Sequence, residues 1–119
     1  MSAGAGELVI TKTSAAGGGV ETITGLTNIG ANDYNTPVGD ILSVSIGTGI
    51  TNVYGDSFKD ATALTSVTFE GTSDVESFGY QTFRNTNLST ITIPASMQTI
   101  GNSSLRSISS LTSVVFESG

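Results

Sequence analysis

The 119-residue sequence contains no cysteine, no histidine and no tryptophan. The missing cysteines exclude disulfides and thiolate metal sites. The missing histidines remove the side chain that most often serves as a catalytic base. Paired carboxylates remain, such as Asp56 with Asp60 or Asp74 with Glu76. These pairs fall in turns that we expect to be exposed, and they lack the cleft that would separate the pKa values of two catalytic carboxylates. We therefore expect no catalytic residues and no enzyme activity.

Positive charge is also scarce. The basic residues Lys12, Lys59, Arg84 and Arg106 stand against ten acidic ones, for a net charge of −6. Because they are scattered along the sequence, we predict no stripe that could follow a phosphate backbone, and nucleic acid is not an expected partner. No apolar run approaches the length of a membrane span. The first residues also lack the basic and apolar regions of a signal peptide.

No metal or cofactor site is predicted. The oxygen-bearing residues of NDYN (32–35) and Asp40 would suit calcium, but no DxDxDG pattern accompanies them. Asn and Asp are also ordinary turn residues. The stretch Gly47-Thr48-Gly49 resembles a phosphate loop only superficially, since no lysine follows it and no helix is expected to begin there. We interpret it as a turn.

What the sequence does contain is a repeat. Its strand-like copies read ILSVSIG (41–47), LTSVTFE (64–70), LSTITIP (88–94) and LTSVVFE (111–117). The equivalent apolar residues Val44, Val67, Ile91 and Val114 follow one another at intervals of 23 or 24 residues. Apolar and hydroxyl side chains alternate within each copy, which is typical of a strand with one buried and one wet face.

A second unit lies between these strands. Its copies read LTNIG (26–30), ITNVYG (50–55), VESFG (75–79) and MQTIG (97–101). The glycine allows a positive φ or a close approach of the backbone. A bulky residue follows a few positions later, as Tyr34, Phe58, Phe83 or Leu105. One coil is therefore predicted to comprise a strand, a turn, a short second strand and a brief helical turn.

The repeat resembles the BspA-like leucine-rich-repeat family. The resemblance is carried by ITNVYGDSFKDATALTSVTFE (50–70), VESFGYQTFRNTNLSTITIP (75–94) and ITIPASMQTIGNSSL (91–105), and it covers roughly residues 41–117. It implies a β-rich solenoid, a right-handed leucine-rich-repeat coil with a parallel sheet and about four repeats of 23–24 residues. Three departures leave that fold intact: Leu105 replaces a usual aromatic residue, Ala61 a common cysteine, and Pro94 occurs in one copy only.

The family also implies a function and a location. Its members act in adhesion, surface display and protein recognition without a catalytic apparatus. We accordingly expect a place at a cell surface, in extracellular material or in a virus particle.

The first forty residues are less regular. We expect residues 1–40 to be an N-terminal leader and capping segment and residues 41–119 to be the repeats. LVITKT (8–13) and VETIT (20–24) are expected to pair as a β-hairpin over residues 8–24, across the glycines at 17–19. Terminal repeats of a solenoid are atypical because they cover its open end. A flexible leader is the alternative, and MSAGAG fits that description by itself.

The outward strand positions are the first candidate surface. Stacked in register about 4.8 Å apart, they would form a ladder of hydroxyl groups. The ladder comprises Ser43, Ser45, Ser66, Thr68, Thr90, Thr92 and Ser113. Three interpretations compete: residues that simply suit an exposed strand, a recognition face for protein or glycan, and, by analogy alone, an ice- or ordered-water-binding face.

The second candidate is the C-terminal edge, formed by Leu111, Val114 and Phe116. No polar capping repeat follows them in this sequence. An uncovered solenoid end exposes core side chains and a strand edge. A truncated sequence, a tolerated short edge and a covering partner are the three explanations. We hypothesise an assembly surface, at which end-to-end stacking would give a ring or filament.

The sequence thus predicts a non-enzymatic interaction or adhesion module that presents its repeat surface to a protein or glycan. The alternative is a structural building block of a virion, fibre or other surface assembly, which would associate with copies of itself through the solenoid ends. Neither function requires a cofactor, nucleic acid or insertion into a membrane.

Overall fold

The computed structural model describes residues 2–117, which form strands joined by turns and two short 3-10 helices. The strands are β1 (Leu8–Lys12), β2 (Val20–Ile23), β3 (Asn28–Ile29), β4 (Ile41–Ile46), β5 (Asn52–Val53), β6 (Ser66–Phe69), β7 (Ser77–Phe78), β8 (Thr90–Ile93), β9 (Thr99–Ile100) and β10 (Ser113–Phe116). The 3-10 helices are η1 (Ser14–Ala16) and η2 (Val38–Asp40).

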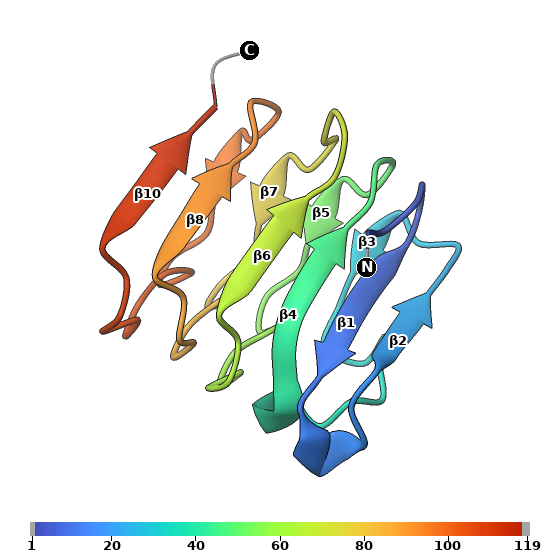
Figure 1. The fold of residues 1–119 in the computed structure, drawn as a ribbon. Coiled ribbons are helices and arrows are strands. Elements are labelled where there is room, and N and C mark those ends of the chain that lie inside the picture. The colour runs from blue at the N-terminus through green and yellow to red at the C-terminus, as the bar shows by residue number, and fades with distance from the viewer. Residues whose placement is uncertain (1, 118–119) are drawn as a thin grey trace.

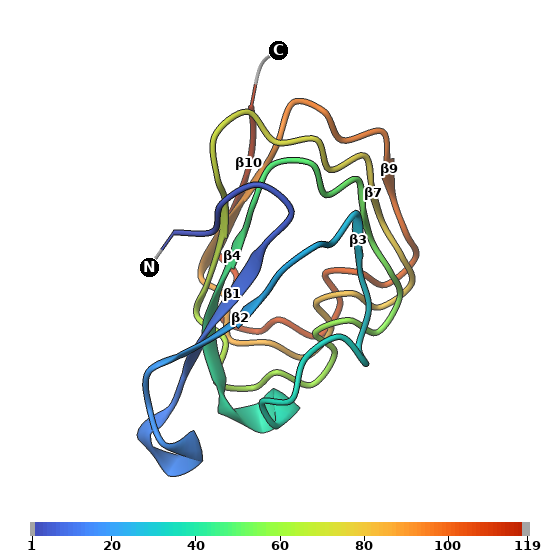
Figure 2. The ribbon, with the colours of Figure 1, turned by 90° about the vertical axis from the view of Figure 1, so that its right-hand side faces the viewer.

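The coil has two sheet faces, which Figure 1 shows one behind the other and Figure 2 shows end-on. The long-strand face consists of β4, β6, β8 and β10 together with β1 and β2, and the short-strand face consists of β3, β5, β7 and β9. Strands of successive coils pair in parallel, with Val44 beside Val67 and Ile91 beside Val114. The predicted solenoid with parallel sheets and about four coils is therefore confirmed.

The N-terminal strands reverse this direction. Strand β1 lies between β2 and β4 and pairs antiparallel with both, so that Leu8 faces Ile23 on one side and Ile46 on the other. The parallel short-strand face already begins at β3, within the segment 1–40. The coil therefore starts before residue 41, and β1 and β2 complete the N-terminal end of the long-strand face.

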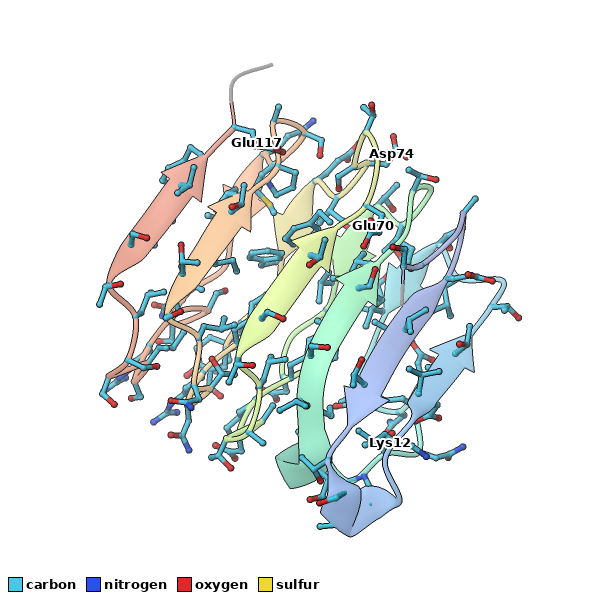
Figure 3. All side chains as sticks on the ribbon, viewed as in Figure 1. Lys12, Glu70, Asp74 and Glu117 are labelled. Carbon is cyan, nitrogen blue, oxygen red and sulfur yellow. The ribbon has the colours of Figure 1, made fainter. Side chains whose placement is uncertain are left out.

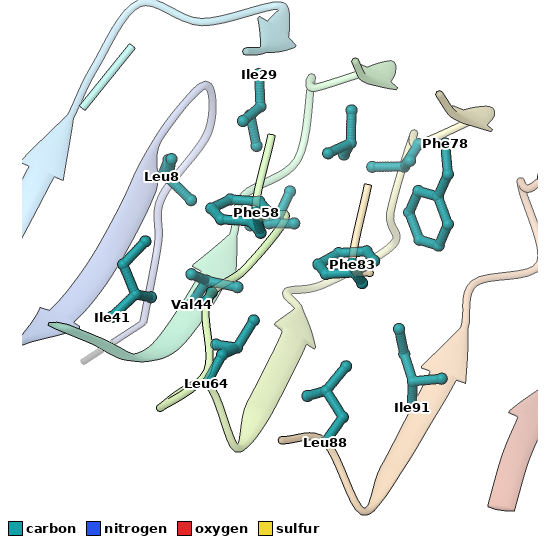
Figure 4. Close-up of a cluster of buried hydrophobic side chains, with 14 of the residues drawn as sticks. Leu8, Ile29, Ile41, Val44, Phe58, Leu64, Phe78, Phe83, Leu88 and Ile91 are labelled. Carbon is teal, nitrogen blue, oxygen red and sulfur yellow. The ribbon is translucent and has the colours of Figure 1, made fainter. Parts of the chain in front are cut away.

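The core is a column of apolar side chains between the two faces (Figure 4). Leu64 and Leu88 are fully buried and stack where the chain enters each long strand, as the repeat predicts. Phe58 lies parallel to Phe83, with ring centroids 5.6 Å apart, and Tyr34 stacks on the other side of Phe58 at 5.7 Å. Offset aromatic stacking adds to the stabilisation from burial, so this column ties the first coil to the next two.

Close backbone contact between coils depends on glycine. A Cβ added at Gly101 would lie 2.6 Å from the carbonyl carbon of Gly79 and 2.8 Å from the carbonyl oxygen of Phe78. Neither glycine is among the residues with positive φ. Of the two roles that the sequence allowed for the repeated glycine, close approach is thus the one that Gly79 and Gly101 serve.

The long-strand face is interrupted between β6 and β8. Within residues 2–117 these two strands do not pair, and the bond from Asn87 N to Leu64 O (3.0 Å) lies before the strands begin. The turn before β8 is also one residue shorter than the turn before β6: Leu88 follows Asn85 by three positions, whereas Leu64 follows Asp60 by four.

The shortened turn also leaves a buried hydroxyl without a partner. Thr86 lies within it, and its Oγ1 has no hydrogen-bond partner in the described chain. The apolar residues of β6 are less buried than those of β8. Val67 and Phe69 are only half-buried, whereas Ile91 and Ile93 are fully buried.

Candidate functional site

The predicted hydroxyl ladder lies on the long-strand face, but it is not one continuous array. Ser66, Thr68, Thr90, Thr92 and Ser113 are all exposed. Thr90 Oγ1 and Ser113 Oγ are 2.8 Å apart and share a hydrogen bond between neighbouring strands. On β4, Ser43 is half-buried, and it is the Cα partner of Ser66.

Ser45 is not part of the exposed ladder, contrary to the prediction. The segment around Ala3 crosses the outer side of β4, where Ala3 N donates to Ser45 Oγ (2.9 Å). The Ser45 hydroxyl in turn donates to Glu70 Oε2 (2.7 Å), and the residue is only 6% exposed. Gly47 lies beneath the same segment, because a Cβ there would overlap the carbonyl oxygen of Gly4. The beginning of the chain therefore packs on the sheet.

The interruption between β6 and β8 divides the ladder a second time. It forms a cleft of about 260 Å³ lined by Val67, Thr68, Phe69, Thr92 and Glu117. Thr68 and Thr92, on its two sides, belong to strands that do not pair. The face therefore carries a hollow that Val67 and Phe69 also line.

The C-terminal edge is exposed as far as the structure describes it. Phe116 is 68% exposed and Val114 is 37% exposed, although both lie on the core side of β10, in register with Ile93 and Ile91. Leu111 differs from them, because it is half-buried against the core. Phe116 also lines a hollow of about 380 Å³ with Met97 and Ile100.

The carboxylates considered for catalysis accept hydrogen bonds from the coil itself. Asp74 Oδ2 accepts from Gly49 N (2.8 Å), and Asp60 Oδ1 accepts from the side-chain amide of Asn85 (3.1 Å). Asp56 is bound by the amide of Gln81. These acids therefore stabilise contacts between coils.

The residues considered for calcium are likewise engaged in turns. Asp33 Oδ2 accepts from Gly30 N (2.7 Å), and Asp40 Oδ1 accepts from the Thr13 hydroxyl (3.0 Å). Over residues 2–117, no group of three or more acidic side chains is arranged to hold a metal ion.

The pKa values of two ionisable groups in the N-terminal coil are shifted. Burial, aided by the charge of Glu21, raises the pKa of Tyr34 to about 12. Partial burial alone would raise the pKa of Glu21, but the hydrogen bonds that its carboxylate accepts from Thr36 and Asn35 outweigh this and lower it. The Glu21 contacts fix residues 35 and 36 against the hairpin, whereas Tyr34 is buried against Phe58 of the next coil.

Three of the four basic residues align in the structure, contrary to the expectation that all are scattered, whereas Lys12 lies apart from them. Lys59, Arg84 and Arg106 occupy equivalent positions of three successive coils, each directly after a core residue (Phe58, Phe83 or Leu105). Backbone bonds join these turns: Asp60 N donates to Arg84 O (2.9 Å), and Asn85 N donates to Arg106 O (3.1 Å). We call Lys59, Arg84 and Arg106 the basic column. Alignment of the repeats on FK, FR and LR would have revealed it.

The turns of the basic column have an unusual backbone. Two residues of each turn have positive φ although they are not glycine: Asp56 and Asp60, Gln81 and Asn85, Ser103 and Ser107. Asn and Asp tolerate this conformation better than most residues. The positive-φ conformation points every second N–H group toward the following coil. The N–H groups of residues 56, 58 and 60 therefore donate to the carbonyls of residues 80, 82 and 84. The column thus rests on a rigid hydrogen-bonded base.

The basic residues lie on one rim of the molecule, where Asp56 and Asp60 also lie. Glu70, Asp74 and Glu117 lie along the rim where the parallel long strands end, and Lys12 lies at the opposite rim (Figure 3). The basic column occupies the turns that precede the long strands, also opposite the acidic rim.

These features define the class of protein. Stacked coils with an apolar interior and exposed polar faces are the architecture of a solenoid repeat protein. The sequence model of the BspA type leucine rich repeat region matches residues 27–119 in six copies. The chain belongs to this family, which is generally a non-enzymatic binding fold that mediates protein interactions and is typically surface-associated.

Other comparisons add no relative. No curated protein matches the chain, and no solved structure matches it. In residues 2–117, no helix has the length and apolar character needed to cross a membrane.

Proposed function

We propose that the chain is a non-enzymatic recognition module that binds a protein or glycan partner through its long-strand face. The observation that carries this proposal is the row of exposed hydroxyl groups at Ser66, Thr68, Thr90 and Thr92, on both sides of a cleft that Val67 and Phe69 also line. Binding sites combine apolar contact area with a few polar groups that fix orientation. The face supplies both on rigid strands.

A pair of charge-inserting variants tests this proposal. Thr68→Lys and Thr92→Lys place a long charged side chain at the cleft, whereas Thr99→Lys places one at an exposed position of the short-strand face. The labelled chain is applied to arrays of immobilised glycans and of surface proteins. Ligands of the native chain should be lost by both cleft variants and retained by Thr99→Lys. Equal loss from all three variants, or from none, would contradict the proposal.

The exposed C-terminal edge favours a second function, that of a building block in a fibre, virion or other surface assembly. Strand β10 pairs with β8 on one side, and within residues 2–117 no strand covers its other side. Val114, Val115 and Phe116 are all exposed there. In a head-to-tail stack this edge would meet β2, the opposite edge of the long-strand face, in a second copy.

Sedimentation over a concentration series tests the building-block function. The native chain should form larger species as the concentration rises, and Phe116→Lys should abolish them without changing the urea midpoint of the monomer. A native chain that remains monomeric at every concentration would rule this function out.

The roles of the N-terminal segment and of the surroundings are part of the same proposal. Residues 1–40 would act as leader and cap, because the antiparallel β1 and the segment around Ala3 cover the first long strand of the coil. The module would operate at a cell surface, in extracellular material or in a virus particle, where adhesion modules of this family are expected.

A further inference from the structure

The basic column is the one place where this acidic protein gathers positive charge. Three of its four basic residues occupy this column, although the chain as a whole carries a net charge of −6. Neighbouring coils of a parallel sheet are about 4.8 Å apart, so the column spans roughly 10 Å. Like charges on adjacent strands destabilise the free protein. An anionic partner would relieve this repulsion.

The residues that flank the column are acidic in the first of its three turns and uncharged in the other two. Lys59 lies between Asp56 and Asp60, but the equivalent residues are Gln81 and Asn85 beside Arg84, and Ser103 and Ser107 beside Arg106. The turn around Lys59 therefore has a net negative charge, while the turns around Arg84 and Arg106 are positive. Free positive charge is concentrated at the two arginines.

Arg84 is also held in place before any partner arrives. Gln81 is buried, and with its amide nitrogen facing Asp56 its oxygen accepts from Arg84 Nη1 (2.5 Å) and from the Tyr80 hydroxyl (3.2 Å). Tyr80 itself is 53% exposed. A side chain fixed in this way loses less conformational entropy on binding. Lys59 and Arg84 line the same shallow hollow, of about 410 Å³, with Asp60, Asn85 and Ser107.

We propose that the basic column, together with Tyr80, binds a short acidic segment of a partner protein. Arginine forms paired hydrogen bonds with carboxylates, and tyrosine and arginine are the residue types enriched at protein interfaces. A column of about 10 Å matches a segment with two or three carboxylates. A column of about 10 Å is short for a nucleic-acid strand, which carries a charge about every 3.4 Å along its whole length. This site lies on the turns and does not depend on the long-strand face.

Binding of labelled poly-L-glutamate to the full chain at low and high salt tests the proposal. The native chain should bind it at low salt, and Arg84→Gln/Arg106→Gln should weaken binding about tenfold or more. The matched control is Lys12→Gln, which removes the same charge away from the column and should change affinity by no more than about twofold. Arg106→Gln alone, at an exposed position, should weaken binding even if the double variant is unstable.

Three results would overturn the proposal. They are a native chain that does not bind poly-L-glutamate at low salt, equal weakening by Lys12→Gln and by the arginine variants, and tighter binding of heparin or single-stranded DNA than of poly-L-glutamate. The last result would assign the column to a different class of polyanion. Loss of the array ligands through Thr68→Lys is a separate outcome, because that variant does not touch the column.

Discussion

Replacement of Gly79 by alanine is the sharpest test of how tightly the coils stack. The new Cβ would overlap the amide nitrogen of Gly55 and would lie 2.8 Å from Gly55 Cα and 2.9 Å from the carbonyl carbon of Tyr54. All three atoms belong to the backbone of the preceding coil, so no side chain can rotate away. The overlap can be relieved only if two coils move apart, which strains the short-strand face and the aromatic column at once.

The expected cost is at the upper end of the range for overpacking, about 3 kcal/mol. With a urea m-value of about 2 kcal/mol/M, the midpoint should fall by about 1.5 M. Far-UV circular dichroism in a urea titration measures this directly. Gly39→Ala is the matched control, because no atom of the described chain beyond its immediate neighbours lies within 4 Å of a Cβ at that position and its φ is not positive. The control should be neutral or stabilising by about 0.4–1 kcal/mol.

Similar midpoints for the two alanine variants would refute this reasoning. It would mean that the coils are not in backbone contact at Gly79 and that the glycine has some other role. A lower midpoint for both variants would point instead to the general loss of a glycine.

Three further predictions concern single side chains. Phe83→Ala should lower the free energy of unfolding by about 3–5 kcal/mol, because Phe83 is fully buried between Phe58 and Phe78; a cost below 1 kcal/mol in urea would show that the column does not stabilise the coil. Thr86→Val should raise the free energy of unfolding by about 1 kcal/mol, because it removes an unpaired buried hydroxyl. Thr82→Val should lower it, because the Thr82 hydroxyl donates to Gly79 O (2.8 Å). A less stable Thr86→Val and a more stable Thr82→Val would contradict both assignments. The pKa of Tyr34 is raised from 10.0 to about 12, so the unfolded chain releases this proton at a lower pH than the folded chain. The contribution of the Tyr34 hydroxyl to folding stability is therefore complete below pH 10 and is lost as the pH rises toward 12. Thermal unfolding across that range should show a steeper loss for the native chain than for Tyr34→Phe, and identical pH profiles would refute the assignment.

Most of the coil could be predicted from the sequence because its physical cause is local. Alternation around Val44, Val67, Ile91 and Val114 determines which side chains face the core, and equal spacing brings the strands into register. The repeated glycine indicated either a positive φ or a close approach of the backbone, and the structure decides between them. These features need only the sequence of one repeat and the fact that it recurs.

The remaining features depend on contacts that one repeat does not contain. The covering of Ser45 by Ala3 joins residues 42 positions apart through a segment of small residues with no distinctive pattern. The reversed position of β1 between β2 and β4 depends on which edge of the coil is free.

Other features were visible in the sequence but needed a different alignment. The shortened turn before Leu88 appears as a single missing residue, but the missing pairing of β6 and β8 is seen only in the three-dimensional path of the chain. The basic column was missed because charges were counted along the chain and not by repeat position.

The interruption between β6 and β8 has a mechanical consequence. At every other level the long-strand face carries interstrand hydrogen bonds, so tension along the coil axis is shared by both faces. At this level the load passes through the pairing of β7 with β9 and through the adjoining turns. We expect the molecule to bend there first under force, opening on the long-strand side while the short-strand side acts as the hinge. A tether pulling on this solenoid would therefore widen the cleft beside Thr68 and Thr92 before any coil unravels.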